Sequence, residues 1–289
     1  MDYSLFLFIF LFVISMITGK FFIRKMPSTI LNVTVILMIF TISLWGGSGI
    51  GGRQIVYLLF LSLLTAPLLI AITYFLGFFL SAKGKSNWEK INLKSQFKYI
   101  LPFIVGMSIG MLFRALPSNV IMSAINYELV ALIVVSGIQI GEDLKLEAIK
   151  KAFGFAMFSV IADVAGAILT SIILTPFFPF KEILLVTLGS GWVTYTAPFI
   201  ANTYGGVAGV FAFLVNFFRD EVAFVLLPLF FRARVSPIGA IAVGGTASMD
   251  AILPLYIELL GNEYTVSAIA SGLVLSMLVP IILPLVALF

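Results

Sequence analysis

Charged side chains stand within long apolar stretches of this 289-residue chain, where ionised groups are unusual. Arg219, Asp220 and Glu221 interrupt one apolar stretch near its middle, and Asp250 follows the glycines of the next. If these stretches cross a bilayer, a carboxylate at its centre costs roughly 2.5 to 3.5 kcal/mol, so keeping one there indicates a function. Such carboxylates can bind a cationic solute, an exchanged ion, or both, because a low dielectric strengthens the pairing.

The composition requires a membrane protein. Hydrophobic residues make up 61% of the chain and charged residues 10%, whereas soluble domains are about a quarter charged. The composition therefore predicts an all-α, polytopic membrane protein. The sequence contains no Cys and no His. It therefore lacks the residues needed for disulfides, thiolate metal sites and Ser–His catalysis, and the usual ligands of zinc and haem. We expect no cofactor, no enzymatic activity and no nucleic-acid partner, and we attribute the net charge of +4 to membrane topology.

Apolar runs bounded by charges or by Pro and Gly predict ten segments. They lie near residues 3–19, 28–47, 54–80, 98–115, 120–140, 152–175, 182–203, 206–231, 236–259 and 264–288. Residues 1–140 are expected to form an N-terminal membrane half, and residues 152–289 a C-terminal half that carries the candidate site. Residues 83–98 form a basic loop.

Lysine and arginine placement predicts the orientation in the membrane. The connections at 20–27, 83–98 and 141–151 carry three, five and three basic residues, and the alternate ones carry only Arg53, Arg114 and Lys181. Because basic loops stay in the cytoplasm, both termini are expected outside the cytoplasmic (inner) membrane. The first segment has its positive charges after the apolar run, unlike a signal peptide, so we expect a retained helix.

The seventh and ninth segments are the least helix-like. They contain Gly189-Ser190-Gly191 and Gly244-Gly245-Thr246, with Pro198 and Pro254 close by. Such residues loosen a helix and free backbone groups, which lipid tolerates only where protein or water satisfies them. The favoured interpretation is eight spanning helices plus two broken or re-entrant hairpins. The alternative is ten segments arranged as a 5+5 inverted repeat, an arithmetic common in secondary transporters.

Other polar residues leave alternatives open. Arg219 and Asp220 could form an internal ion pair. Asp163, near the centre of the sixth segment, could be a lone protonated acid bonded to a neighbouring helix or a functional group. Glu128 could be solvated near the outer interface, and Asn216 could bridge helices or line a site. The excess of acids over the single arginine suits a cationic solute.

Several motifs of the second half occur in a consistent order and spacing. They are Gly137–Gln139, Gly189–Trp192, Asn216–Glu221, Gly244–Asp250, Leu253–Pro254 and Ser271–Pro280. In these the chain resembles the bacterial and archaeal lysine exporter family, small cytoplasmic-membrane proteins that expel L-lysine and its toxic analogue thialysine. The resemblance covers roughly residues 130–289, whereas the first half matches only in hydropathy, helix count and basic loops.

The resemblance implies eight spans, both termini outside, and two essential acids within the membrane, which fall on Glu221 and Asp250. The family has Arg directly before the first of these acids, whereas this chain has Asp220 there and Arg219 one place earlier.

Lysine export gives each candidate residue an expected role. The residues expected to bind substrate are Glu221, Asp250, Asn216, Thr246, Ser248, Gly191 and Trp192. The acids expected to take the coupling ion are Asp250, Glu221, Asp220 and Asp163. Freed amides near Gly191 or Gly245 would receive the substrate's carboxylate, and freed oxygens near Gly245 and Asp250 could hold Na⁺.

No nucleotide-binding motif is present, so we expect antiport in which H⁺ or Na⁺ enters as lysine leaves. The alternatives are an exporter of another basic amino acid or cation, and an ion channel. An intramembrane enzyme would need Asp220 or Glu221 to pair with Asp250, and nothing marks a lipid or peptide substrate. The lipid bilayer is the expected surrounding, and a homodimer is left open.

Overall fold

The computed structural model describes residues 3–22, 26–49, 52–80, 100–113, 117–143, 146–233, 235–249 and 251–289. Within these ranges the chain is almost wholly helical and has no strand, which confirms the all-α class. Asp250, Arg114 and the basic segment 83–98 lie outside the described residues.

All ten predicted segments are helical where they are described. Eight of them are unbroken: α1 (Tyr3–Phe21), α2 (Ser28–Gly49), α3 (Gly52–Phe79), α4 (Ile100–Leu112), α5 (Ser118–Asp143), α6 (Leu146–Leu174), α9 (Gly206–Ala233) and α12 (Thr265–Leu288). Among the described helices, α3, α5, α6 and α12 are long and apolar enough to cross a membrane. Outward-facing Phe10 and Phe60 are 61% and 63% exposed, as expected of side chains that face lipid.

The seventh and ninth segments are each broken in two. The seventh consists of α7 (Phe180–Thr187) and α8 (Val193–Tyr204). The ninth consists of α10 (Pro237–Gly244), the 3-10 helix η2 (Gly245–Met249) and α11 (Leu253–Leu260), and η3 (Asn262–Tyr264) follows it. Ser190, Gly191 and Gly245 at the breaks have φ of 50°, 77° and 55°. These left-handed values end a right-handed helix and favour glycine.

The unbroken helices alternate in direction between two ends of the bundle. Gly141 near the end of α5 lies against the backbone of Met16 and Lys20 near the end of α1, so these two helices run parallel. Gly110 of α4 lies in the same way against Leu44 of α2. We call the end of the bundle at which α1, α3, α5 and α9 finish the basic end, after the lysine-rich sequence of its connections.

The seventh segment enters and leaves at the end opposite the basic end. Lys181, at the start of α7, donates through its Nζ to the carbonyl of Ala287 at the end of α12, 2.7 Å away. At the other arm, α8 ends at Tyr204, next to Gly206, which packs against Trp45 at the end of α2. Both arms therefore start from one end, and α7 and α8 form a re-entrant hairpin, here called the first hairpin (residues 180–204).

The ninth segment enters and leaves at the basic end. Gly239 of α10 lies against Tyr74 near the end of α3. Tyr264, which follows α11, packs edge-on against Phe155 near the start of α6, with ring centroids 5.7 Å apart. This segment is the second hairpin (residues 237–260).

The two hairpins correct the alternative of a 5+5 inverted repeat. The first half has five unbroken helices, whereas the second half alternates three unbroken helices with two hairpins. The inverted arrangement lies within the second half instead. There α6 starts at the basic end and is followed by the first hairpin at the opposite end. Helix α9 starts at that opposite end and is followed by the second hairpin at the basic end. The two helix–hairpin units therefore run in opposite directions.

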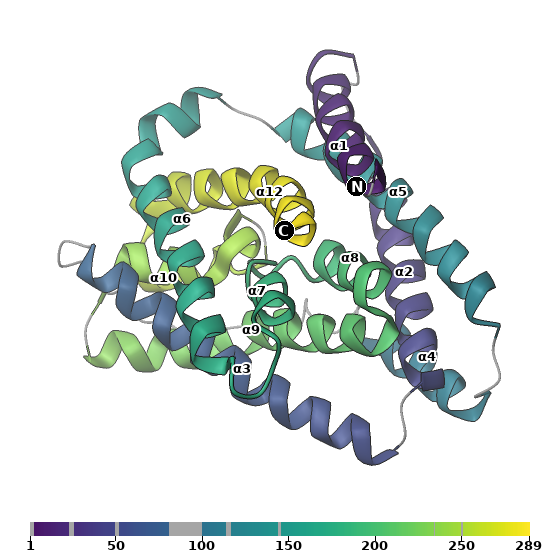
Figure 1. The fold of residues 1–289 in the computed structure, drawn as a ribbon. Helices are drawn as coiled ribbons and strands as arrows, with labels where there is room; N and C mark the ends of the chain where they lie inside the picture. Colours follow the sequence, from purple (N-terminus) through teal and green to yellow (C-terminus); the bar gives the residue numbers. More distant parts are fainter. Residues whose placement is uncertain are drawn as a thin grey trace.

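The helices form two groups in space (Figure 1). The first group consists of α1, α2, α4 and α5 on one flank, and the second contains both hairpins together with α6, α9 and α12. Helix α3 packs on α6, α9 and α10, and α8 reaches across to α2 and α5. Asp163, Asn216, Arg219 and Thr246 all belong to the second group.

The absence of native cysteine permits a direct test of this topology. Single cysteines at Lys181, Tyr204 and Arg53 should react with a membrane-impermeant maleimide from one side of intact membranes. Cysteines at Lys20, Arg232 and Glu263 should react from the other side, because the hairpin arms return to the end they came from. Labelling of positions 181 and 204 from opposite sides would show that the seventh segment crosses the membrane.

Candidate functional site

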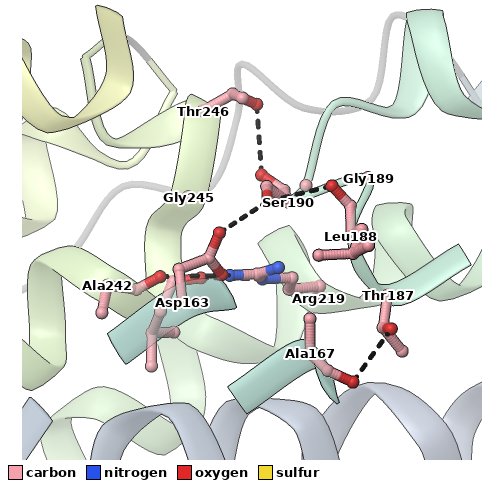
Figure 2. A network of polar contacts seen from close by, with 12 residues as sticks. Asp163, Ala167, Thr187, Leu188, Gly189, Ser190, Arg219, Ala242, Gly245 and Thr246 are labelled. Carbon is pink, nitrogen blue, oxygen red and sulfur yellow. Dashed lines mark hydrogen bonds and ion pairs between the residues drawn. The ribbon is translucent and has the colours of Figure 1, made fainter. Parts of the chain in front are cut away.

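The turns of the two hairpins meet inside the bundle. The backbone N–H of Thr246 donates to the carbonyl of Ser190 at 2.8 Å, and the Thr246 hydroxyl donates to the same oxygen at 3.2 Å (Figure 2). A Cβ built on Gly245 would stand 2.1 Å from that oxygen, so only glycine permits this approach. We call residues 188–192 and 245–249 the two tips.

A buried ion pair lies beneath the tips. Arg219 of α9 and Asp163 of α6 are both 0% exposed, and Nη2 of the arginine pairs with Oδ1 of the aspartate. The other carboxylate oxygen, Oδ2, accepts a hydrogen bond of 2.5 Å from the Ser190 hydroxyl (Figure 2). Asp163 therefore connects α6 and α9 to the first hairpin.

Arg219 also binds the end of a helix. Its Nε donates to the carbonyl of Val243 at 2.9 Å, and its Nη2 donates to that of Ala242 at 3.1 Å. These carbonyls belong to the last turn of α10, whose final carbonyls lack the i+4 partners of a continuing helix. The carbonyl of Ala242 also accepts from the N–H of Gly245. A cation at a helix C-terminus is also favoured by the helix dipole. Nη1 of Arg219 is buried and has no acceptor among the described residues.

Asn216, one turn earlier on α9, binds the first hairpin. Its Oδ1 accepts from the backbone N–H of Gly191 at 2.9 Å, and its Nδ2 donates to the carbonyl of Val186 at 3.0 Å. The side chain therefore joins the end of α7 to its tip. Asn216 and Arg219 together attach one hairpin each to α9.

Further hydroxyls fix the arms. Thr187, at the end of α7, lies 2.8 Å from Ser171 (Oγ1 to Oγ) and donates to the carbonyl of Ala167 at 3.1 Å (Figure 2). In the second hairpin, the Ser248 hydroxyl lies 2.9 Å from the carbonyl of Ala268 on α12. The Tyr256 hydroxyl donates to the carbonyl of Ala240 at 2.9 Å, so α11 is bonded to α10.

The structure brings most of the predicted site residues together, with two exceptions. Gly191, Asn216, Thr246 and Asp163 belong to the tip network described above, and Ser248 and Trp192 stand in the two tips. Asp220 is also buried, and a Cβ on Gly191 would stand 2.8 Å from its Oδ1. Asp250 lies outside the described residues.

Glu221 is the second exception. It is half-buried, and its Oε1 is enclosed without a hydrogen-bond partner among the described residues. Residues two apart on a helix point about 200° from each other, so Glu221 faces away from Arg219.

Three interpretations from the sequence are corrected. The ion-pair partner of Arg219 is Asp163 and not its neighbour Asp220. Asp163 is consequently not a lone acid. The amides of Gly191 and Gly245 are not available to a carboxylate, because they donate to Asn216 Oδ1 and to the carbonyl of Ala242.

Glu128 and the prediction of a sodium site concern other parts of the bundle. Glu128 of α5 accepts a hydrogen bond of 2.9 Å from the Thr41 hydroxyl of α2, and so bridges helices of the first group. Among the described residues, no group of three or more acidic side chains is arranged to hold a metal ion.

Sequence reasoning missed Ser190 as a member of the site, and it missed the role of Arg219 at the end of α10. The signal for Ser190 was its place between two glycines, which predicted a turn but not a partner. No signal in the sequence connects Arg219 with Val243, because the contact depends on the path of the second hairpin.

Comparison with known proteins identifies relatives of residues 100–287, which include the end of the first half and nearly all of the second. The family model described as "Lysine exporter LysO" matches residues 100–287. The chain is similar to the lysine exporter LysO of Escherichia coli, with 29% identity over 185 residues, which cover 62% of this chain and 60% of that protein. It is also 29% identical over 162 residues to a putative lysine exporter of Haemophilus influenzae, covering 54% of this chain and 80% of that protein.

We expect Asp163→Asn to destabilise the protein strongly. The substitution leaves Arg219 charged and buried without a counter-charge, which costs about 3–5 kcal/mol. Denaturant titration of the detergent-solubilised protein measures the change in free energy of unfolding. The exposed Glu263→Gln is the control and should change it by less than about 0.5 kcal/mol. Equal stability of the two variants would show that the buried pair contributes nothing.

Gly245→Ala should separate the tips. The new Cβ meets the Ser190 carbonyl, and its backbone conformation (φ 55°, ψ −128°) is open only to glycine, with strain of about 1–3 kcal/mol. Gly154→Ala is the matched control, because a Cβ there meets nothing within 4 Å. Thermal unfolding should show a lower midpoint for Gly245→Ala alone, and similar midpoints would contradict the close approach of the tips.

Proposed function

This chain belongs to the lysine exporter LysO family, and on that premise we propose that it is a secondary active transporter that exports L-lysine. Analogues such as thialysine would share the route, and H⁺ or Na⁺ would enter in exchange. The chain spans about 60% of the length of the E. coli relative, so its substrate and coupling are proposals that rest on the following arguments.

The observation that supports transport most strongly is the meeting of two re-entrant hairpins from opposite ends of the bundle. Ser190 of the first tip accepts two hydrogen bonds from Thr246 of the second. Secondary transporters place broken helices at the bilayer midplane, where half-helix ends and freed backbone groups face the substrate and ion. Movement of either hairpin would open the meeting point toward a different side.

One acid of α9 and one of the ninth segment fit a cationic substrate. Lysine carries two ammonium groups and one carboxylate. Glu221, whose Oε1 lacks a partner among the described residues, and Asp250 are proposed to receive ammonium groups. The same carboxylates, with Asp220, would bind the coupling ion in the absence of lysine, which is the minimal mechanism of exchange.

Asp163 is assigned a different role from that of an ion-exchanging acid. Its two oxygens already accept from Arg219 and Ser190, so a coupling ion bound there would compete with the contacts that hold the first hairpin. Asp163 therefore positions the tips.

The membrane potential explains why coupling is needed. Moving a net positive charge out of a cell with a negative interior costs about 2.3 kcal/mol per charge per 100 mV. The sequence has no nucleotide-binding motif, so an ion gradient is the remaining source of free energy. The distribution of basic residues supports an N-out and C-out orientation in the cytoplasmic membrane.

Radiolabelled lysine counterflow in proteoliposomes tests the proposal. Wild type should show saturable exchange that responds to an imposed H⁺ or Na⁺ gradient. Glu221→Gln and Asp250→Asn should each abolish it, since each removes a carboxylate that receives ammonium. The exposed Glu263→Gln should exchange at the wild-type rate.

The outcomes separate the competing functions. Stronger competition by arginine or ornithine than by lysine would point to another basic amino acid as substrate. Flux that neither saturates nor requires exchange would identify a channel and contradict the proposal, as would lysine exchange that ignores both ion gradients.

A further inference from the structure

We propose that the free edge of the Arg219 guanidinium, at Nη1, binds the α-carboxylate of the transported amino acid. This inference rests on the proposed function, because it assigns a part of the substrate to a residue at the tips. It makes Arg219 the residue that distinguishes an amino acid from a simple amine.

Four of the backbone amides at the tips already have acceptors within the protein. The N–H of Gly191 donates to Asn216, and that of Thr246 donates to the carbonyl of Ser190. The N–H groups of Trp192 and Gly245 donate to the carbonyls of Gly189 and Ala242. A carboxylate entering the low-dielectric centre needs strong donors, and charged donors give hydrogen bonds about twice as strong as neutral ones.

Arg219 supplies such a donor. The side chain is 0% exposed, and Nη1 has no acceptor among the described residues. A buried donor without an acceptor is costly, about 1–3 kcal/mol and more for a charged group. The other enclosed side-chain donors without partners in the described part of the chain are hydroxyls, so Nη1 is the one charged donor among them.

The guanidinium is also fixed in orientation. Nε is bonded to the Val243 carbonyl, and Nη2 to the Ala242 carbonyl and the Asp163 carboxylate. Because the group is planar, these three contacts determine where Nη1 points. The donor is thus preorganised and loses little freedom when a carboxylate arrives.

Charge balance favours this assignment. Asp163 neutralises Arg219, so the pair can stay buried between transport cycles. When a substrate carboxylate binds at Nη1, its negative charge is accompanied by the substrate's ammonium groups, which Glu221 and Asp250 are proposed to receive. Arg219 is fully buried while the tips touch, so the carboxylate reaches Nη1 only when they separate.

Binding measurements with substrate analogues test the assignment on wild-type protein. The analogues 1,5-diaminopentane and lysine methyl ester keep the ammonium groups and lack the carboxylate charge. Each should displace radiolabelled lysine from wild type about 10- to 100-fold less well than lysine does, the effect of losing one charged hydrogen bond.

Arg219→Lys should remove the discrimination. The substituted ammonium side chain keeps the positive charge but lacks the planar guanidinium with its several donors. The affinity of this variant for the substrate L-lysine should therefore fall about 10- to 100-fold. Affinity for 1,5-diaminopentane should stay the same, a result that a purely structural role of Arg219 does not predict. The exposed Arg53→Lys is the matched control, and it should keep the wild-type ratio of affinity for lysine to affinity for 1,5-diaminopentane. If Arg219→Lys does not fold, the charge-neutral double variant Asp163→Asn/Arg219→Gln replaces it. The double variant should also lose the preference for lysine over the diamine.

The results distinguish this inference from the proposed function. If wild type binds and exchanges lysine but accepts the diamine equally well, the carboxylate assignment is wrong and lysine export stands. If the Arg219 variants keep the wild-type ratio, the assignment is equally wrong. If wild type neither binds nor exchanges lysine, the proposed function fails and this inference fails with it.

Discussion

At the centre of the bundle a guanidinium and a carboxylate face each other without exposure to solvent, and the packing of both hairpins depends on them. Asp163 accepts a hydrogen bond from the Ser190 hydroxyl of the first tip, and Arg219 donates hydrogen bonds to the last carbonyls of α10 in the second hairpin. Two buried charges are expensive unless paired and hydrogen-bonded. In the positions seen here both hairpins contribute hydrogen bonds to the pair, and the pair in turn holds both hairpins.

Each hairpin has a helix end inside the bundle, and polar side chains of α9 bind the backbone groups at these ends. A helix that ends within a membrane leaves carbonyls without partners. Asn216 satisfies the end of α7 and Arg219 the end of α10. The two residues are three apart, which places them on neighbouring parts of one face of α9. One helix thus binds two hairpins that enter from opposite ends of the bundle. The tips of the hairpins meet beside the contacts that Asn216 and Arg219 make.

The sequence predicted the architecture well, because hydropathy and glycine placement act locally. The ten segments, the breaks near Gly191 and Gly245, and the hairpin interpretation all follow from composition and the cost of free backbone groups. The partner of Arg219 could not be predicted in this way. Asp220 is adjacent in sequence, whereas Asp163 lies 56 residues away, and only the path of the hairpins brings it close. The same limit applies to the amides of Gly191 and Gly245, which looked free in the sequence and are bonded in the structure.

Transport by the proposed mechanism requires the two tips to separate. Because the chain has no cysteine, Ser190→Cys/Thr246→Cys introduces one thiol on each tip, at residues that a backbone hydrogen bond of 2.8 Å joins. A disulfide between the two thiols is reversible and would hold the tips together. The measurement is lysine counterflow before oxidation, after oxidation and after reduction. Oxidation should form the disulfide and stop exchange, and reduction should restore it. Exchange of lysine by the cross-linked protein at the rate of the reduced protein would show that the tips need not separate.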